Sequence, residues 1–252
     1  MADNTADADD DLELKPANAG TMFRLEMFTT NFLLGYWKQL VAVVVVFLVL
    51  ILAWGQYQDI TRRTQREATA RIAEKVSELP QPLPMLSQAI ASGEEIDAAK
   101  VQEVGDGLVA IANGTRGTAK VEALLTAAEA YRLAGAPDKQ REALSEAVPL
   151  ARGVLHYSAS SALANLELEQ GQGDEAVKRF RELGSENEGY LAEQAQIDLA
   201  LALEHLGRNQ EAADVYQKFL DQFPDSPRRA IVEQRRDRVT AAGAGGSEGS
   251  AG

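Results

Sequence analysis

ALALEHLGRNQEAADVYQKFLDQFP, residues 200–224, contains two helical runs on either side of Gly207. Glycine supplies the left-handed backbone conformation with which many helices end, because it has no Cβ to clash there. The segment therefore predicts two helices joined by a tight turn.

The same glycine occurs twice more upstream, each time 36 residues earlier. Each copy has an alanine seven positions before the glycine, a Glu-Ala pair after it, and a large apolar residue seven positions beyond that pair. The marker residues are Ala128, Gly135, Glu142-Ala143 and Leu150; Ala164, Gly171, Glu175-Ala176 and Leu183; and Ala200, Gly207, Glu211-Ala212 and Phe219. The glycines and the alanines seven positions before them share the same 36-residue spacing, which indicates an internal repeat rather than chance.

The spacing predicts an all-α solenoid of about three to four helical hairpins over residues 85–240. Small residues let paired helices approach, the glycine turns the chain, and large residues on the second helix fill the gap to the next hairpin. In this alignment the first copy has three extra residues around Ala136-Pro137-Asp138, in its turn. A last helix is expected at 226–239.

Composition argues against several functions. The chain of 252 residues carries a formal net charge of −13, which disfavours binding to nucleic acid. It has no cysteine and two histidines, so thiol chemistry and cysteine-ligated zinc are excluded. Phosphate-binding loops, G-x-S-x-G and H-E-x-x-H are missing from the sequence. We therefore expect no enzyme activity, cofactor, metal site or small-molecule substrate.

Individual polar residues also have ordinary explanations. His205 is expected as a favourable residue at a helix C-terminus, and His156 in a turn. The pairs Glu167/Glu169 and Asp174/Glu175 are expected on solvated helix faces. The arginines 228, 229, 235, 236 and 238 would form the polar cap that a solenoid needs at its end, or alternatively a surface for an acidic partner or lipid headgroups.

An uncharged apolar run, LVAVVVVFLVLILAW, spans Leu40–Trp54. Tyr36 and Trp37 precede it and Tyr57 follows, as in the aromatic belts of membrane interfaces. A helix over 36–57 would span about 30 Å, the thickness of a hydrocarbon core. We therefore expect a transmembrane helix at 31–57 that contacts lipid through 36–57.

The remaining segments complete the predicted layout. Residues 1–30 form an acidic, disordered tail and an interfacial lead-in, and 58–84 a helical stalk that ends at a proline-rich break. Residues 241–252 form a flexible Gly/Ser/Ala tail. Five cations between Arg62 and Lys75, against three before the run, would by the charge rule leave the C-terminal domain in the cytoplasm.

The repeats resemble the tetratricopeptide family, whose pattern has a small residue at position 8, glycine at 15, alanine at 20, an aromatic at 24 and proline at 32. The last copy matches with Ala200, Gly207, Ala212, Tyr216 and Pro224, whereas the middle copy has Glu188 in place of the proline. This resemblance implies a protein-binding concave surface. If the family's inward positions carry over, they are Glu122, Leu125, Glu129 and Arg132; Ser158, Ser161, Asn165 and Leu168; and Gln194, Ile197, Leu201 and Glu204.

The layout of tail, anchor, stalk and repeat domain also resembles the YfgM-type ancillary subunits of the SecYEG translocon. That resemblance implies a bacterial inner-membrane protein with a cytoplasmic N-terminus and a periplasmic domain, associated with the export machinery and periplasmic chaperones. The alternatives are a cell-envelope assembly or division adaptor, a cytoplasm-facing repeat scaffold, and an enzyme whose site the sequence does not reveal.

Overall fold

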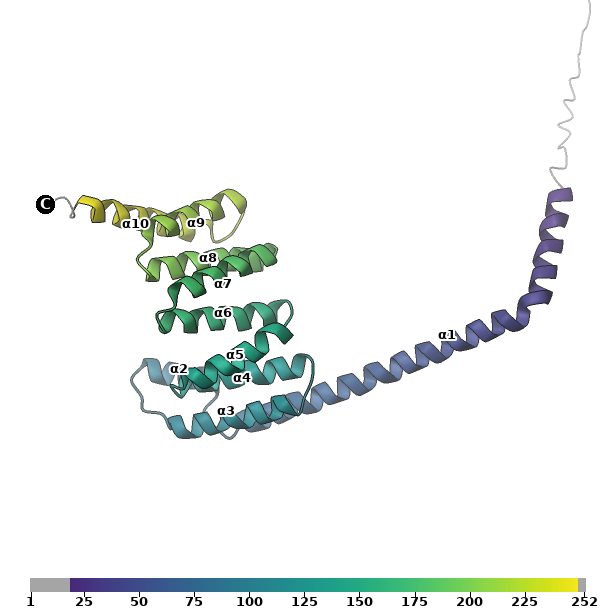
Figure 1. Cartoon of the computed structure of the whole chain (residues 1–252), viewed down its shortest axis with the longest axis horizontal. Coiled ribbons are helices and arrows are strands. Elements are labelled where there is room, and N and C mark those ends of the chain that lie inside the picture. The colour runs from purple at the N-terminus through teal and green to yellow at the C-terminus, as the bar shows by residue number, and fades with distance from the viewer. Residues whose placement is uncertain (1–18, 249–252) are drawn as a thin grey trace, which may run out of the picture. The chain divides into compact units, whose positions relative to one another are not determined.

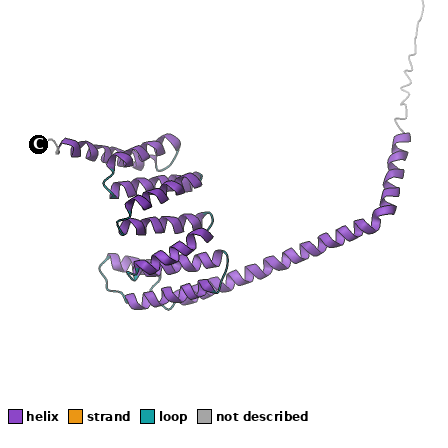
Figure 2. Ribbon diagram, viewed as in Figure 1, coloured by secondary structure: helices purple, strands orange, loops and turns teal. Residues whose placement is uncertain are grey.

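The structure is a computed structural model that describes the backbone of residues 19–248 and the side chains of 41–56 and 63–243. All the regular structure in that part of the chain is helical (Figure 2). Of the predicted tail and lead-in at 1–30, residues 1–18 lie outside the described residues. Backbone contacts divide the chain into two units, Met1–Thr61 and Arg62–Gly252.

The first unit contains most of α1 (Ala19–Val76), which continues into the second unit. The large apolar side chains from Val41 to Trp54 on this helix are 50 to 70% exposed. Over the residues that the structure describes, no helix is both long and apolar enough to cross a membrane. The side chains of Tyr36, Trp37 and Tyr57 lie outside that description.

The second unit is a stack of helical hairpins, as Figure 1 shows. From α3 to α10, each helix packs chiefly on its neighbours in the sequence, which is the contact pattern of a solenoid. The elements are α2 (Leu83–Ala91), α3 (Ala98–Asn113), α4 (Thr118–Leu133), α5 (Pro137–Leu150), α6 (Val154–Glu169), α7 (Gly173–Glu186), α8 (Gly189–His205), α9 (Asn209–Gln222) and α10 (Arg229–Glu248). The predicted all-helical repeat architecture is confirmed.

The three predicted glycine turns are also confirmed. Gly135, Gly171 and Gly207 follow α4, α6 and α8 with φ of 67°, 76° and 71°. At the first, the Gly135 N–H donates to the Arg132 carbonyl and the Ala136 N–H to the Tyr131 carbonyl. The same two bonds recur at the other two glycines. This is the Schellman motif, which satisfies carbonyls that the end of a helix would otherwise leave unpaired.

A second glycine series escaped the sequence interpretation. Gly117, Gly153 and Gly189 each precede one of the first three by 18 residues and also have positive φ, at the starts of α4, α6 and α8. Glycine is a weaker signal for the start of a helix than for its end, because serine, threonine, asparagine and aspartate are preferred over glycine at helix starts. Both turns of every hairpin from α4 to α9 therefore depend on a left-handed glycine.

The alignment of the first copy is wrong. The helix α5 begins two residues after Gly135, as α7 begins two residues after Gly171, so the first turn has no extra residues. The position of Ala176 and Ala212 is held by Gln140, which is only 5% exposed. Leu150 is 48% exposed, and Ala147 takes the core place assigned to it. The Glu142-Ala143 pair of α5 lies three residues out of register with the pairs of α7 and α9. The equivalent position holds the polar Gln140, so the sequence alignment did not recognise it.

The 36-residue register also extends one repeat upstream. The largest core side chains stand at equivalent positions of the second helix of each hairpin, Leu108, Leu144, Phe180 and Tyr216, all essentially buried. The short helix α2 contacts α4, as α4 contacts α6, so α2 and α3 fill the places of a further hairpin. The core is therefore a column of apolar layers, made of two clusters that both include residues of α6.

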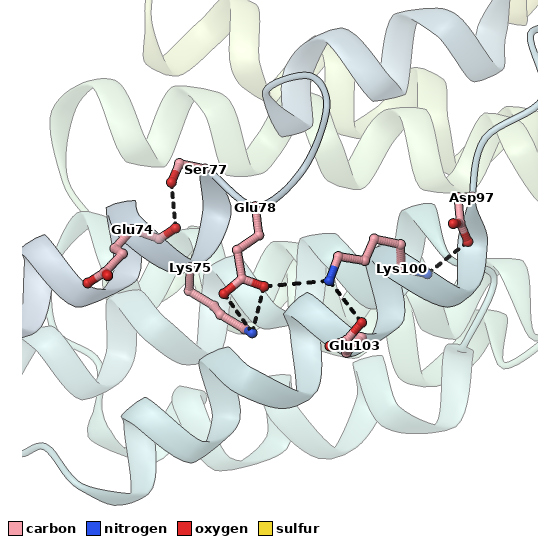
Figure 3. Close-up of polar contacts among 7 residues, drawn as sticks. All are labelled: Glu74, Lys75, Ser77, Glu78, Asp97, Lys100 and Glu103. Carbon is pink, nitrogen blue, oxygen red and sulfur yellow. Dashed lines mark hydrogen bonds and ion pairs between the residues drawn. The ribbon is translucent and has the colours of Figure 1, made fainter.

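The end of α1 belongs to this column. Ala68 and Ile72 are buried, and Ile72 packs in the same apolar cluster as residues of α3 and α4. Figure 3 shows a row of ion pairs over the junction, from Lys75 and Glu78 to Lys100 and Glu103, with nitrogen–oxygen distances of 2.9 to 3.6 Å. The hydrogen bond from Lys75 holds the pKa of Glu78 below its usual value. The compact unit thus starts at Arg62, earlier than the expected residue 85.

The other end is closed by α10, whose arginines face their own domain. These arginines, and Arg228 just before the helix, bind polar groups of α8 and α9 or of α10 itself. The Arg228 guanidinium also lies 4.6 Å from the ring centre of Tyr190. This arrangement supports the polar-cap interpretation. The helix continues to Glu248, through residues where the sequence predicted a flexible tail.

The Gly171 turn can be tested by Gly171→Ala. A left-handed conformation costs an L-residue about 1–2 kcal/mol, so we expect the free energy of unfolding to fall by about 1 kcal/mol. Denaturant titration followed by circular dichroism measures it. The control is Gly114→Ala: Gly114 ends α3 with φ −88°, where a Cβ meets no atom closer than 3.6 Å. Equal losses in both variants would contradict the expected role of the left-handed turn.

Candidate functional site

A depression lies along the first helices of three successive hairpins. It has a volume of about 420 Å³ and opens between α4, α6 and α8. We call it the groove. Its lining residues are Arg132, Asn165, Leu168, Glu169, Asp198, Leu201, Ala202 and His205. Four of these, at 132, 165, 168 and 201, are among the predicted inward positions.

Arg132 stands at one end of the groove in a fixed orientation. Its guanidinium donates two hydrogen bonds to Glu129, at 2.7 and 2.9 Å, and one to Ser87 of α2 at 3.3 Å. The hydrogen bond to Glu129 raises the pKa of Arg132. The pair therefore presents a guanidinium whose direction is set by the helices beneath it.

The middle of the groove combines apolar surface with an open amide. Leu168 and Leu201 are half-buried, and Asn165 is exposed between them and Arg132. Within the part of the chain that the structure describes, the Asn165 side chain makes no hydrogen bond. An asparagine amide has both donors and an acceptor, so it can pair with a peptide group.

Asp198 is a groove residue that the sequence interpretation missed. Its carboxylate accepts from the Tyr157 hydroxyl at 2.6 Å and from Gln194 at 2.7 Å, which links α6 to α8. Burial first, and then this hydrogen bond, raises the pKa of Tyr157. Glu169 and His205 were also missed as groove residues, although they lie 36 residues apart, each directly after a predicted inward position. That spacing was the available signal.

Several predicted residues have other contacts. Ser158 and Ser161 donate to carbonyls of their own helix. Gln194 accepts from Arg228 in the turn before α10, and Glu204 accepts from the Tyr216 hydroxyl and, at 2.6 Å, from Arg238 of α10. The structure thus places Gln194 and Glu204 in contacts that hold α10 against α8, outside the groove lining.

A smaller pocket of about 220 Å³ lies between α4, α5 and α6 and shares Arg132, Asn165 and Glu169 with the groove. Leu125 and Glu129 line it as well. Glu122 and Ile197 line neither depression, although Ile197 packs on the core cluster. The depressions therefore bring together Leu125, Glu129, Arg132, Asn165, Leu168 and Leu201 of the predicted set.

Two other expectations need correction. Glu167 is only 4% exposed and is held by Arg179 at 2.7 and 3.1 Å, so it does not lie on a solvated face. His156 lies in the first turn of α6 rather than in a loop, with its Nδ1 3.1 Å from the Val148 carbonyl. Both residues connect neighbouring helices of the stack, which a one-dimensional pattern does not show.

Comparison with known proteins gives a consistent fold. The sequence model described as "Tetratricopeptide repeat-like domain" matches residues 31–241. Crystal structures of a putative kinesin light chain from Podosopora anserina with nearly identical TPR-like repeats, and of a variant of it, are similar at TM-scores of 0.51 and 0.50 with 18% identity. The matches cover 66% of this chain and 86 to 87% of those chains. A search of curated proteins gave no match.

The structural role of Glu204 predicts a double-variant result. Glu204→Leu leaves the buried Tyr216 hydroxyl without its acceptor, so we expect a loss of about 1–3 kcal/mol in the free energy of unfolding. Adding Tyr216→Phe removes the unpaired hydroxyl and should recover most of the loss. Urea unfolding of the four proteins measures the coupling. Additive losses would show that the hydroxyl and the carboxylate do not depend on each other.

Proposed function

The chain belongs to the family of tetratricopeptide repeat-like domains, and we propose that it is a membrane-anchored scaffold that binds a polypeptide segment in the groove. Repeat folds of this kind are typically interaction scaffolds without catalytic activity. The observation that carries the proposal is the groove itself, where an unpaired Asn165 amide stands beside the apolar surface of Leu168 and Leu201. An extended segment can pair its backbone with the amide and bury a side chain on the leucines.

The charges of the groove favour a basic partner segment. Glu169 and Asp198 line it without a cationic partner among the described residues, whereas Arg132 is already paired with Glu129. The chain as a whole is also acidic. Charge complementarity chiefly sets specificity and the rate of association, so a lysine or arginine beside an apolar side chain fits this surface.

The anchor rests on the apolar part of α1. A row of large apolar side chains exposed all round a helix is unfavourable in water, and lipid is the environment that removes this cost. The sequence extends the row with aromatic residues at 36, 37 and 57. Tethering raises the local concentration of the domain near membrane partners, so that weak groove contacts suffice.

We place the repeat domain in the bacterial periplasm, beside the export machinery and its chaperones, because the layout resembles that of the translocon's ancillary subunits. One observation favours a second candidate, a cytoplasm-facing scaffold. Arg63, Arg66, Arg71 and Lys75 follow the apolar run directly, and cations near a span mark its cytoplasmic side. An envelope-assembly or division adaptor would use the same groove with a different partner.

Groove binding can be tested by photocrosslinking in membranes that hold the full chain. A photoreactive residue in place of Leu201 should give a discrete adduct, and one at the exposed Lys178 of α7 should not. Asn165→Ala and Glu169→Gln should each reduce the Leu201 adduct about fivefold, the effect of one lost hydrogen bond of about 1 kcal/mol. Glu175→Gln, an exposed acidic residue of α7, is the control. The proposal fails if the adduct is unchanged by the groove variants.

The anchor and its orientation need a separate experiment. We expect the chain to stay with membranes at high pH and high salt, and Val44→Asp with Leu48→Asp to release it, because each charge costs about 2.5–3.5 kcal/mol in a span. Protease added to spheroplasts should cut the C-terminal tail if the domain is periplasmic. Cleavage only in inverted vesicles would instead support the cytoplasm-facing scaffold.

A further inference from the structure

A second pocket lies between α7, α8 and α9, on another face of α8. Its volume is about 320 Å³, and it shares no lining residue with the groove. Apolar side chains make most of its wall, and two cationic residues belong to its lining. The lining residues are Phe180, Arg181, Gly184, Ser185, Ala195, Gln196, Leu199, Val215 and Lys218.

The pocket exists because this repeat lacks a side chain that its neighbours have. Gly184 of α7 occupies the position of Val148 one repeat earlier and of Leu220 one repeat later. Val148 packs on the core, and Leu220 is buried. A Cβ at Gly184 would meet only the Cβ of Ala195, at the ordinary distance of 3.8 Å. The backbone therefore does not require glycine there, and the space is available for a ligand.

A buried amide in the same pocket is the second departure from the repeat. Gln196 stands where Ser160 and Val232 stand in the flanking repeats. It is 8% exposed, and its Nε2 donates to the Gln222 side chain at 2.5 Å. Its Oε1 is buried and has no hydrogen-bond partner among the described residues. An unpaired buried acceptor is costly, so this oxygen calls for a donor from outside the chain.

The cationic part of the lining indicates what else a ligand brings. Arg181 pairs with Glu211 at 3.2 Å, and Glu211 is also held by Arg208. The Lys218 ammonium, in contrast, has no carboxylate within ion-pair distance in the described part of the chain. A ligand with a carboxylate next to its apolar body would supply the missing anion.

We propose that this pocket binds the C-terminal tryptophan or tyrosine of a partner polypeptide. The ring fills the space that Gly184 leaves, and the indole N–H or phenol O–H donates to Gln196 Oε1. The terminal carboxylate meets Lys218. An aromatic ring with one polar hydrogen suits a mostly apolar pocket that contains a single unpaired acceptor. This site goes beyond the groove, and each can be lost without the other.

The test is an isothermal titration calorimetry experiment, in which the peptide acetyl-Gly-Ser-Gly-Trp is added to the full chain in detergent micelles. We expect saturable binding that weakens about fivefold to tenfold when the peptide carries a C-terminal amide, and similarly when phenylalanine replaces tryptophan. The amide removes the carboxylate and phenylalanine removes the donor. Equal binding of N-acetyltryptophan would identify a free aromatic acid as the ligand and overturn the peptide assignment.

Chain variants locate the binding. Gly184→Val introduces the side chain of the preceding repeat and should abolish binding, with a thermal melt to show that the variant is folded. Lys218→Gln, on the surface, should weaken the free-carboxylate peptide about fivefold and leave the amide peptide unchanged. Asn165→Ala, in the groove, should have no effect. Binding that survives Gly184→Val, or no saturation by about 10 mM peptide, would mean that the pocket holds only water.

Discussion

The left-handed glycine that ends the first helix of each hairpin is the constraint on which the solenoid depends. At Gly135, Gly171 and Gly207 it reverses the chain while two backbone hydrogen bonds satisfy the end of the preceding helix. Because the next helix starts two residues later each time, equivalent residues recur every 36 positions and their side chains stack in register. The apolar column then follows from which residues stand at those positions.

The groove and the pocket between α7, α8 and α9 relate to this register in different ways. The groove is a product of the repeat, because Asn165 and Leu201 hold one repeat position and Arg132 and Leu168 another, on consecutive first helices. The pocket under Gly184 is a product of a departure from it, at one repeat, where a core side chain is missing and the amide of Gln196 replaces a small or apolar residue. Depressions in the surface thus arise both from periodicity and from its interruption, while the column beneath them stays packed.

How far the sequence predicted the structure follows from the same physics. The glycine turns were predictable because a positive φ restricts the residue type, and Asn165, Leu168 and Leu201 because position within a repeat fixes the direction of a side chain. Gln140 was not predictable, since a polar letter occupies a core position. Gln194 and Glu204 were placed in the site by their repeat positions, but their partners are Arg228 and Arg238, each 34 residues away. A repeat pattern carries no information on such contacts.

The register itself can be measured directly by inserting a second copy of residues 154–189 after Gly189. Stacked repeats add nearest-neighbour interfaces, so the longer chain should unfold in one cooperative transition, with unchanged helicity per residue and a larger denaturant dependence. The same insert without its Gly171 equivalent should lose that cooperativity. Two results would contradict the claim that the glycine turns set a single register for the whole stack. The 36-residue insert could unfold separately, or it could behave like the insert that lacks the Gly171 equivalent.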